Sequence, residues 1–182
     1  ECVTCNGTDY ALLSRSSDNE RTLLMARWFH CVKLPNDVLS EDHPFTEMWE
    51  DKKPPHLFLC APDGSNLVSL DGQQSRSELW KKMESVLSQE YKRDPVRAVR
   101  NILKVFVEYD HLDSMEDFLT ARLEDKLEKD GPKSAKVRKI RRQIDELQER
   151  KEKAQVREDK ASELDLIRQK PAQAEPTVVA AG

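Results

Sequence analysis

The sequence has no apolar run near the roughly 18 residues that a membrane-spanning helix needs. It also has no signal-peptide pattern of a charged start, an apolar stretch and a small-residue cleavage site. Excess charge of one sign is small, since 30 Lys and Arg against 34 Asp and Glu leave a net charge of −4. We therefore expect no membrane span and no nucleic-acid partner, because nucleic-acid binding favours a basic chain.

Cysteine is scarce, with four residues in 182 at positions 2, 5, 31 and 60. Four are too few for a disulfide scaffold at this length. A structural zinc site needs four ligands, and Cys2-Val3-Thr4-Cys5 has no second CxxC or HxxxH pair beside it. We therefore expect no metal site. The sequence also lacks a phosphate-binding loop, a Ser-His-Asp arrangement and a paired-carboxylate site.

The four cysteines fall into two classes by their surroundings. Cys31 and Cys60 lie in apolar stretches, where a cysteine is usually a small buried core residue. Cys2 and Cys5 lie in polar sequence before Gly7, where reactive cysteines occur. Any thiol chemistry is therefore expected at Cys2 and Cys5.

A strand–turn–strand–helix pattern occupies residues 54–87. Two apolar runs, 57–60 and 67–70, flank Asp63-Gly64, a pair typical of the tight turn of a β-hairpin. Ser75, Ser77 and Glu78 can then cap a helix with apolar residues at helical spacing. Those residues are Leu79, Trp80, Met83, Val86 and Leu87. Pro54-Pro55 precedes the first strand, and an X-Pro bond is the common site of a cis peptide.

This unit resembles the C-terminal half of the thioredoxin fold, and the resemblance extends upstream. Residues 20–27 look like a short helix, residues 28–34 like a strand, and Cys2-Val3-Thr4-Cys5 stands where the family keeps its CxxC. With a Val after its first Cys, the motif is similar to that of the C-terminal domain of bacterial thiol:disulfide interchange transporters. The resemblance implies an α/β fold with a thioredoxin-like mixed sheet and flanking helices.

The resemblance also implies roles for individual residues. Cys2 would be the nucleophile, Cys5 would resolve the mixed disulfide, and Pro55, as the cis-proline, would line the substrate groove beside Pro54. It implies a protein substrate or redox partner and no cofactor other than a redox-active Cys2–Cys5 disulfide. An extracytoplasmic setting is expected from the resemblance alone, and a cytoplasmic one stays open.

One element of the thioredoxin fold has no clear counterpart. The fold places a central strand before CxxC, and only Glu1 precedes Cys2. Either the chain is a fragment that lacks this strand, or residues 10–14 are the strand. In the second register, residues 15–18 would occupy the active-site loop and the domain would be redox-inactive.

The second half of the chain predicts helices. Asp94-Pro95 starts one helix, Asp110-His111 interrupts it, and Ser114 with Asp117 can cap another. Gly131-Pro132 is a stop, and from Lys133 a long helix carries apolar residues three and four apart, as in a coiled coil. These are Val137, Ile140, Ile144 and Leu147. We expect residues 114–129 to pack on the start of the long helix, which projects or frays beyond residue 150.

The expected organisation is a thioredoxin-like domain over 1–92, a charged helical extension over 93–168 and a disordered tail over 169–182. A basic run at 133–142 is interpreted as a solvated helix face, since acids follow it on the same helix. The expected function is thiol–disulfide exchange on protein cysteines through Cys2 and Cys5. The alternative is a redox-inactive, thioredoxin-like protein-binding module whose helical extension contacts the partner.

Overall fold

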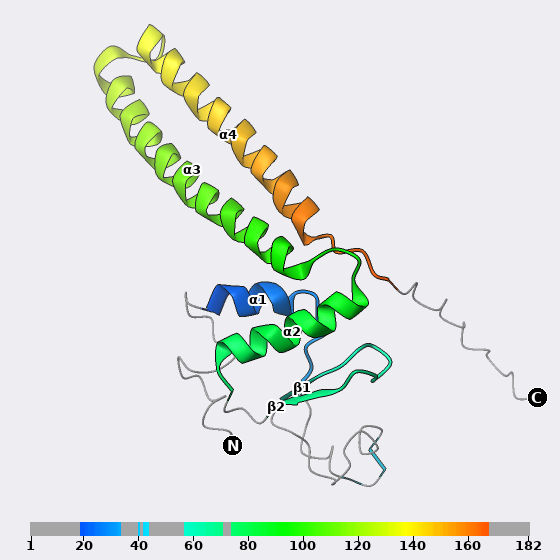
Figure 1. Cartoon of the computed structure of the whole chain (residues 1–182). Coiled ribbons are helices and arrows are strands. Elements are labelled where there is room, and N and C mark those ends of the chain that lie inside the picture. The colour runs from blue at the N-terminus through cyan, green and yellow to red at the C-terminus, as the bar shows by residue number, and fades with distance from the viewer. Residues whose placement is uncertain (1–18, 34–39, 41, 44–56, 71–73, 168–182) are drawn as a thin grey trace, which may run out of the picture. The chain divides into compact units, whose positions relative to one another are not determined.

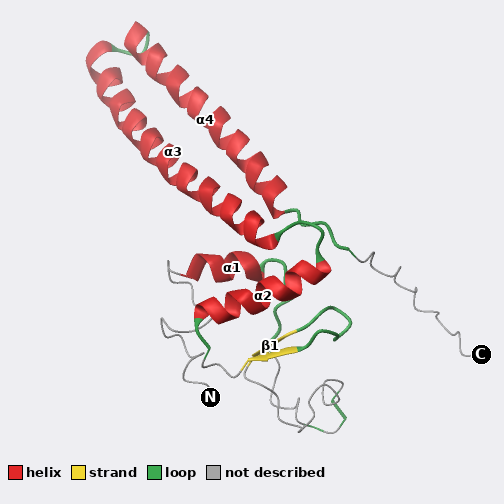
Figure 2. Cartoon of the chain, viewed as in Figure 1, coloured by secondary structure: helices red, strands yellow, loops and turns green. Residues whose placement is uncertain are grey.

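The computed structural model describes residues 19–33, 40, 42–43, 57–70 and 74–167. These residues form a mixed, helix-rich fold with one small antiparallel sheet (Figures 1 and 2). The elements are α1 (Glu20–Ala26), β1 (Leu57–Leu59), β2 (Val68–Leu70), α2 (Arg76–Glu90), α3 (Pro95–Asp130) and α4 (Ala135–Ser162). The chain divides into two compact units, one of Glu1–Arg93 with Asp165–Gly182 and one of Asp94–Leu164. Within the described ranges, no helix is both long and apolar enough to cross a membrane.

The first unit contains the predicted β-hairpin and helix. β1 and β2 pair antiparallel, with Leu57 opposite Leu70 and Leu59 opposite Val68. α2 packs on β1, and α1 packs on α2. The apolar side chains predicted for α2 form part of the core, since Leu79, Met83, Val86 and Leu87 are all buried.

The predicted start of α2 is confirmed as a capping box. The Glu78 backbone amide donates to Ser75 Oγ at 3.3 Å, and the Ser75 amide donates to Glu78 Oε2 at 2.8 Å. Each side chain thus satisfies a backbone amide that the first helical turn leaves without a partner.

The connection between the strands is longer than the predicted tight turn. Gly64 does adopt a positive φ of 79°, as the Asp-Gly pair predicts. The turn closes on itself, because the Ala61 amide donates to the Ser65 carbonyl at 2.8 Å and the Ser65 amide donates to Asp63 Oδ1 at 3.0 Å. Strand pairing therefore begins only at Leu59 and Val68.

The predicted strand at 28–34 is wrong for residues 28–33, which are described and are not a strand. The chain leaves α1 through a further turn, in which the Trp28 amide donates to the Met25 carbonyl and the Phe29 amide to the Ala26 carbonyl. These local bonds use backbone groups that a strand would offer to a neighbouring strand. Cys31 is exposed, so its predicted burial is also wrong.

The second unit is a helical hairpin made of α3 and α4. Asp94 caps α3 by accepting bonds from the amides of Val96 and Arg97, and Pro95 fills the first helical position, as predicted. Gly131 ends α3 with a φ of 77°, and Ser134 caps α4 through the Val137 amide at 3.1 Å. Each of these boundaries follows from a local capping signal.

Two predictions about the hairpin are wrong. α3 runs unbroken through Asp110-His111, and Ser114 Oγ donates to the Asp110 carbonyl at 2.8 Å instead of starting a new helix. α4 neither projects nor frays at residue 150 but continues to Ser162, packed along α3.

The two helices meet along an apolar stripe, called here the seam. Its core is Leu112 and Leu119 of α3 with Ile140 and Leu147 of α4. Further along α4, Ala154 is fully buried. Spacings of three and four residues on both helices are those of an antiparallel coiled coil.

Candidate functional site

The residues predicted to carry thiol chemistry, Cys2, Cys5, Pro54 and Pro55, lie outside the described residues. So do the alternative strand at 10–14 and the predicted tail at 169–182. The described segment nearest to the two prolines is β1, which begins at Leu57.

The two described cysteines differ in environment. Cys31 is exposed, while Cys60 is half-buried at the end of β1, and neither forms a disulfide. Burial raises the pKa of the Cys60 thiol above its ordinary value, and the negative charge of Asp63 raises that pKa further. Because the thiolate is the nucleophile, Cys60 is poorly suited to attack near neutral pH. In the described part of the chain, no three His, Cys, Asp or Glu side chains are grouped to hold a metal ion.

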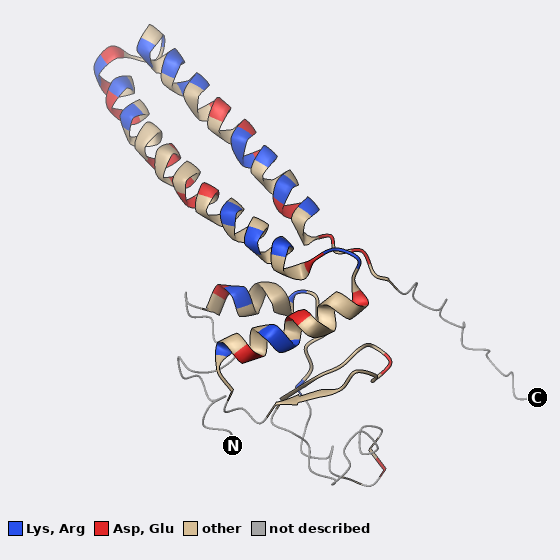
Figure 3. Cartoon of the chain, viewed as in Figure 1, with Lys and Arg blue, Asp and Glu red and all other residues tan. Residues whose placement is uncertain are grey.

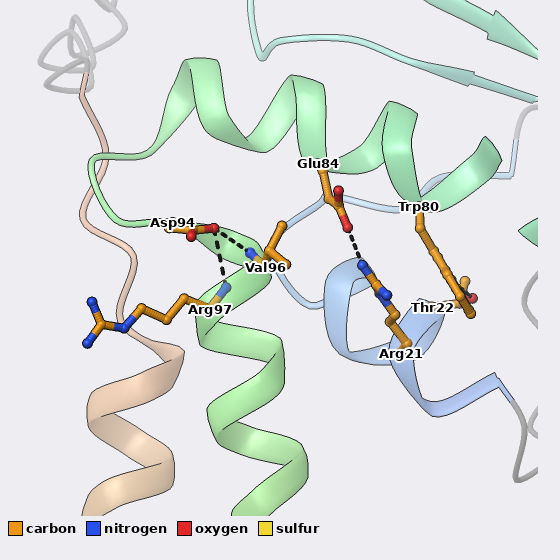
Figure 4. Close-up of polar contacts among 7 residues, drawn as sticks. All are labelled: Arg21, Thr22, Trp80, Glu84, Asp94, Val96 and Arg97. Atoms are coloured by element: carbon orange, nitrogen blue, oxygen red, sulfur yellow. Dashed lines mark hydrogen bonds and ion pairs between the residues drawn. The ribbon is translucent and has the colours of Figure 1, made fainter. Parts of the chain in front are cut away.

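A polar cluster joins α1 to α2 (Figure 4). The Trp80 indole N–H donates to Oγ1 of the fully buried Thr22 at 2.8 Å. The Arg21 guanidinium lies 4.6 Å from the centre of the Trp80 ring and forms an ion pair with Glu84. Since a seven-residue helix is not stable alone, these contacts and the buried Leu24 and Met25 hold α1 in place.

The chain segments on either side of the hairpin unit are tied together within the first unit. Tyr91 and Leu166 form an isolated antiparallel bridge. The Lys92 amide donates to the Asp165 carbonyl, and the Ile167 amide donates to the Glu90 carbonyl, each at 2.8 Å. An ion pair between Arg93 and Asp165 adds to this contact at 2.9 Å. The helical hairpin is therefore an insertion whose two ends leave from neighbouring points.

α3 and α4 both carry many acidic and basic residues (Figure 3), and some of them form contacts between the two helices. Lys151 lies 2.6 Å from a carboxylate oxygen of Asp113 and also contacts Glu116. Arg157 binds both carboxylate oxygens of Glu108, at 2.8 and 2.9 Å. These hydrogen bonds raise the pKa of Lys151 and lower that of Glu108. They fix the register of the two helices where the seam is least apolar.

Large apolar side chains are exposed on both helices of the hairpin. Val107 and Phe118 of α3 are 69% and 64% exposed, and Val156 of α4 is 65% exposed. Val156 is a single exposed valine on α4, whereas Val107 and Phe118 lie on one face of α3. An exposed pair on one face is a more specific sign of binding than a single exposed valine.

Comparison with protein-family models, with curated proteins and with solved structures finds no match to this chain. The resemblance to thioredoxin-like proteins consequently rests on the residues of the chain itself. The Tyr91–Leu166 bridge and the Lys151 contacts were not predicted. Both join residues far apart in the sequence, and no local spacing marks either pair.

Proposed function

We propose that the chain is a thiol–disulfide oxidoreductase that exchanges disulfides with a partner protein through Cys2 and Cys5. The observation that carries the proposal is the order of described elements after Pro54-Pro55. An antiparallel pair, β1 and β2, follows the prolines and leads directly into the capped helix α2. Strand, hairpin and closing helix in this order are what the resemblance to the thioredoxin fold implies. The proposal extends that fold to the rest of the first unit and favours an extracytoplasmic setting.

The reaction follows from the chemistry of two neighbouring thiols. The Cys2 thiolate attacks one sulfur of a partner disulfide, which forms a mixed disulfide and releases the other partner sulfur as a thiolate. The Cys5 thiolate then attacks the sulfur of Cys2, which frees the second partner sulfur. The partner gains two electrons and two protons, and the chain is left with a Cys2–Cys5 disulfide. A dithiol reductant regenerates the thiols, and the reverse sequence oxidises a partner.

A redox titration of the full chain in glutathione buffers, with thiol trapping read by mass spectrometry, tests the proposal. We expect Cys2 and Cys5 to convert together to one disulfide at a defined potential, while Cys31 and Cys60 stay outside that transition. Cys2→Ser should abolish reduction of an insulin-type disulfide substrate, and Cys31→Ser is the matched control. Independent titration of Cys2 and Cys5, or unchanged activity of Cys2→Ser, would overturn the proposal.

A second candidate function is a redox-inactive protein-binding module, and the hairpin unit favours it specifically. α3 and α4 are held in one register by Lys151 and Arg157 and expose Val107 and Phe118. A stiff helical pair with an exposed apolar face can bind a protein without any thiol chemistry. The same titration separates the two functions, because only the oxidoreductase requires a Cys2–Cys5 disulfide.

A further inference from the structure

The face of α3 that carries Val107 and Phe118 has a second stripe with three- and four-residue spacing. The stripe is distinct from the seam residues Leu112 and Leu119, which are buried, whereas nearly all of its members are exposed. Only Asp125 is partly covered, with its side chain 42% exposed. In chain order the stripe is Arg97, Arg100, Lys104, Val107, His111, Ser114, Phe118, Ala121, Asp125 and Glu128. Strict alternation of three and four is the spacing of a coiled-coil contact.

The stripe is complementary to its own reverse. When two copies of the stripe are aligned antiparallel, Arg97 of one lies opposite Glu128 of the other, Arg100 opposite Asp125, and Val107 opposite Phe118. Each basic residue except Lys104 thus faces an acidic one, and Lys104 faces the small Ala121. The centre pairs His111 with Ser114. A helix face whose ends carry opposite charge, with one exposed apolar side chain on each side of its centre, fits an antiparallel copy of itself.

We propose that this face of α3 binds a second copy of the chain, with the two α3 helices antiparallel about a two-fold axis beside Leu112-Asp113. Such an interface is isologous, so Val107 of each copy contacts Phe118 of the other. Antiparallel helices also place the opposite ends of their dipoles side by side. A parallel pair would instead place Arg97 and Arg100 of the two copies together. The proposal does not depend on the proposed thiol chemistry.

The charge pattern of α3 agrees with this orientation (Figure 3). From Pro95 to Tyr109 there are three basic residues and one acidic residue, and from Asp110 to Asp130 there are eight acidic and three basic residues. Within the described residues, the Arg97 and Glu128 side chains form no ion pair. Both remain available to a second copy.

One edge of the proposed interface is repulsive. Asp110 and Asp117 lie beside the stripe, and the two-fold axis brings Asp110 of one copy near Asp117 of the other. Asp117→Asn should therefore tighten the dimer. If this face instead bound an unrelated basic partner, the same substitution would weaken that binding. Salt should weaken the contact overall, because its two ends are held by exposed charges.

Sedimentation equilibrium of the full chain in a reducing buffer measures the interface without interference from intermolecular disulfides. We expect a concentration-dependent dimer. Phe118→Ser should raise its dissociation constant by roughly tenfold or more, since a buried aromatic contact is lost twice. Val156→Ser is the matched control, because Val156 is as exposed as Phe118 but lies on α4. Its dissociation constant should not change.

A charge swap tests the orientation of the two helices. Arg97→Glu alone should weaken the dimer, and adding Glu128→Arg should restore it, because the two positions face each other only in the antiparallel arrangement. A chain that stays monomeric at about 100 μM would overturn the proposal, since a specific dimer of this kind is expected in the micromolar range. Equal effects of Phe118→Ser and Val156→Ser, or no restoration by the swap, would also overturn it.

Discussion

The ammonium of Lys151 on α4 lies 2.6 Å from a carboxylate oxygen of Asp113 on α3, and it also contacts Glu116. Lys151 stands four residues after Leu147 and three before Ala154, so the spacing of the seam calls for an apolar side chain there. On α3, Glu116 lies between Leu112 and Leu119, next to Met115, which packs against the seam core. A polar layer of this kind fixes the register of two helices at some cost in stability.

Replacing the polar layer with Lys151→Leu and Glu116→Leu together should raise the unfolding temperature of the hairpin. Lys151→Ala alone should lower its stability by roughly 0.5–1 kcal/mol, because the pair is partly exposed. Thermal unfolding followed by circular dichroism at 222 nm measures both effects. Arg142→Ala, which removes an exposed ion pair with Glu146 on α4, is the control and should change little. A double variant less stable than Lys151→Ala would contradict the assignment of this layer to the seam.

Thr22→Val should destabilise the first unit by about 1–3 kcal/mol, because the Trp80 indole N–H would lose its acceptor in a part-buried site. Trp80→Phe removes the donor and should cost a similar amount, and it also weakens the stacking of Arg21. The double variant should cost clearly less than the sum of the two, as for any interacting pair. Urea unfolding followed by circular dichroism gives the three free energies. Simple additivity would show that the hydrogen bond does not couple α1 to α2.

The elements that sequence reasoning predicted correctly are those with local signals. The capping pair Ser75 and Glu78, the Asp94-Pro95 start and the Gly131 stop each act on the backbone within a few residues, so α2, α3 and α4 begin or end where expected. The predictions that were wrong concern segments whose structure depends on contacts beyond their local sequence. Residues 28–33 have strand-like composition, but the amides of Trp28 and Phe29 donate back to α1, and Asp110-His111 stays helical because Leu112 is fully buried.

Of the candidate sites, the sequence indicated the thiol pair but not the face of α3 that we propose binds a second copy. Cys2-Val3-Thr4-Cys5 stands out in the sequence by its spacing, whereas Val107 and Phe118 stand out only by their exposure in the folded hairpin. The stripe from Arg97 to Glu128 is present in the sequence, and a search for a second pattern of three- and four-residue spacing could have found it. Burial was needed to show which of the two stripes faces α4.

Alkylation of Cys60 should require alkaline conditions. Burial and the charge of Asp63 raise its pKa above the ordinary value of a thiol, so the reactive thiolate accumulates only as the pH rises through the raised pKa. Asp63→Asn removes the second cause of the shift and should move the midpoint of the alkylation profile to lower pH. Iodoacetamide labelling read peptide by peptide in a mass spectrometer measures this midpoint. Asp42→Asn is a control for a general loss of negative charge, and an equal shift in that variant would contradict the role of Asp63.

Excision of the hairpin should leave the first unit folded. Residues 94–164 leave and return at Arg93 and Asp165, whose neighbours are joined by the Lys92–Asp165 and Ile167–Glu90 backbone bonds. Joining Arg93 to Asp165 through Asn-Gly leaves a three-residue loop, Arg93-Asn-Gly, between the facing residues Lys92 and Asp165, and a glycine at the last loop position suits such a hairpin turn. We expect the excised chain to keep a cooperative unfolding transition by near-ultraviolet circular dichroism of its tryptophans.

The control carries the same excision with Ile167→Pro, which removes the amide that donates to the Glu90 carbonyl. This variant should be less stable than the simple excision, because the bridge loses one of its two backbone bonds. If the excised chain instead has no tertiary signal, the first unit depends on the hairpin for its fold, and the insertion model is wrong. If it folds but still forms a dimer as strong as that of the full chain, the proposed α3 interface fails as well, since α3 is absent.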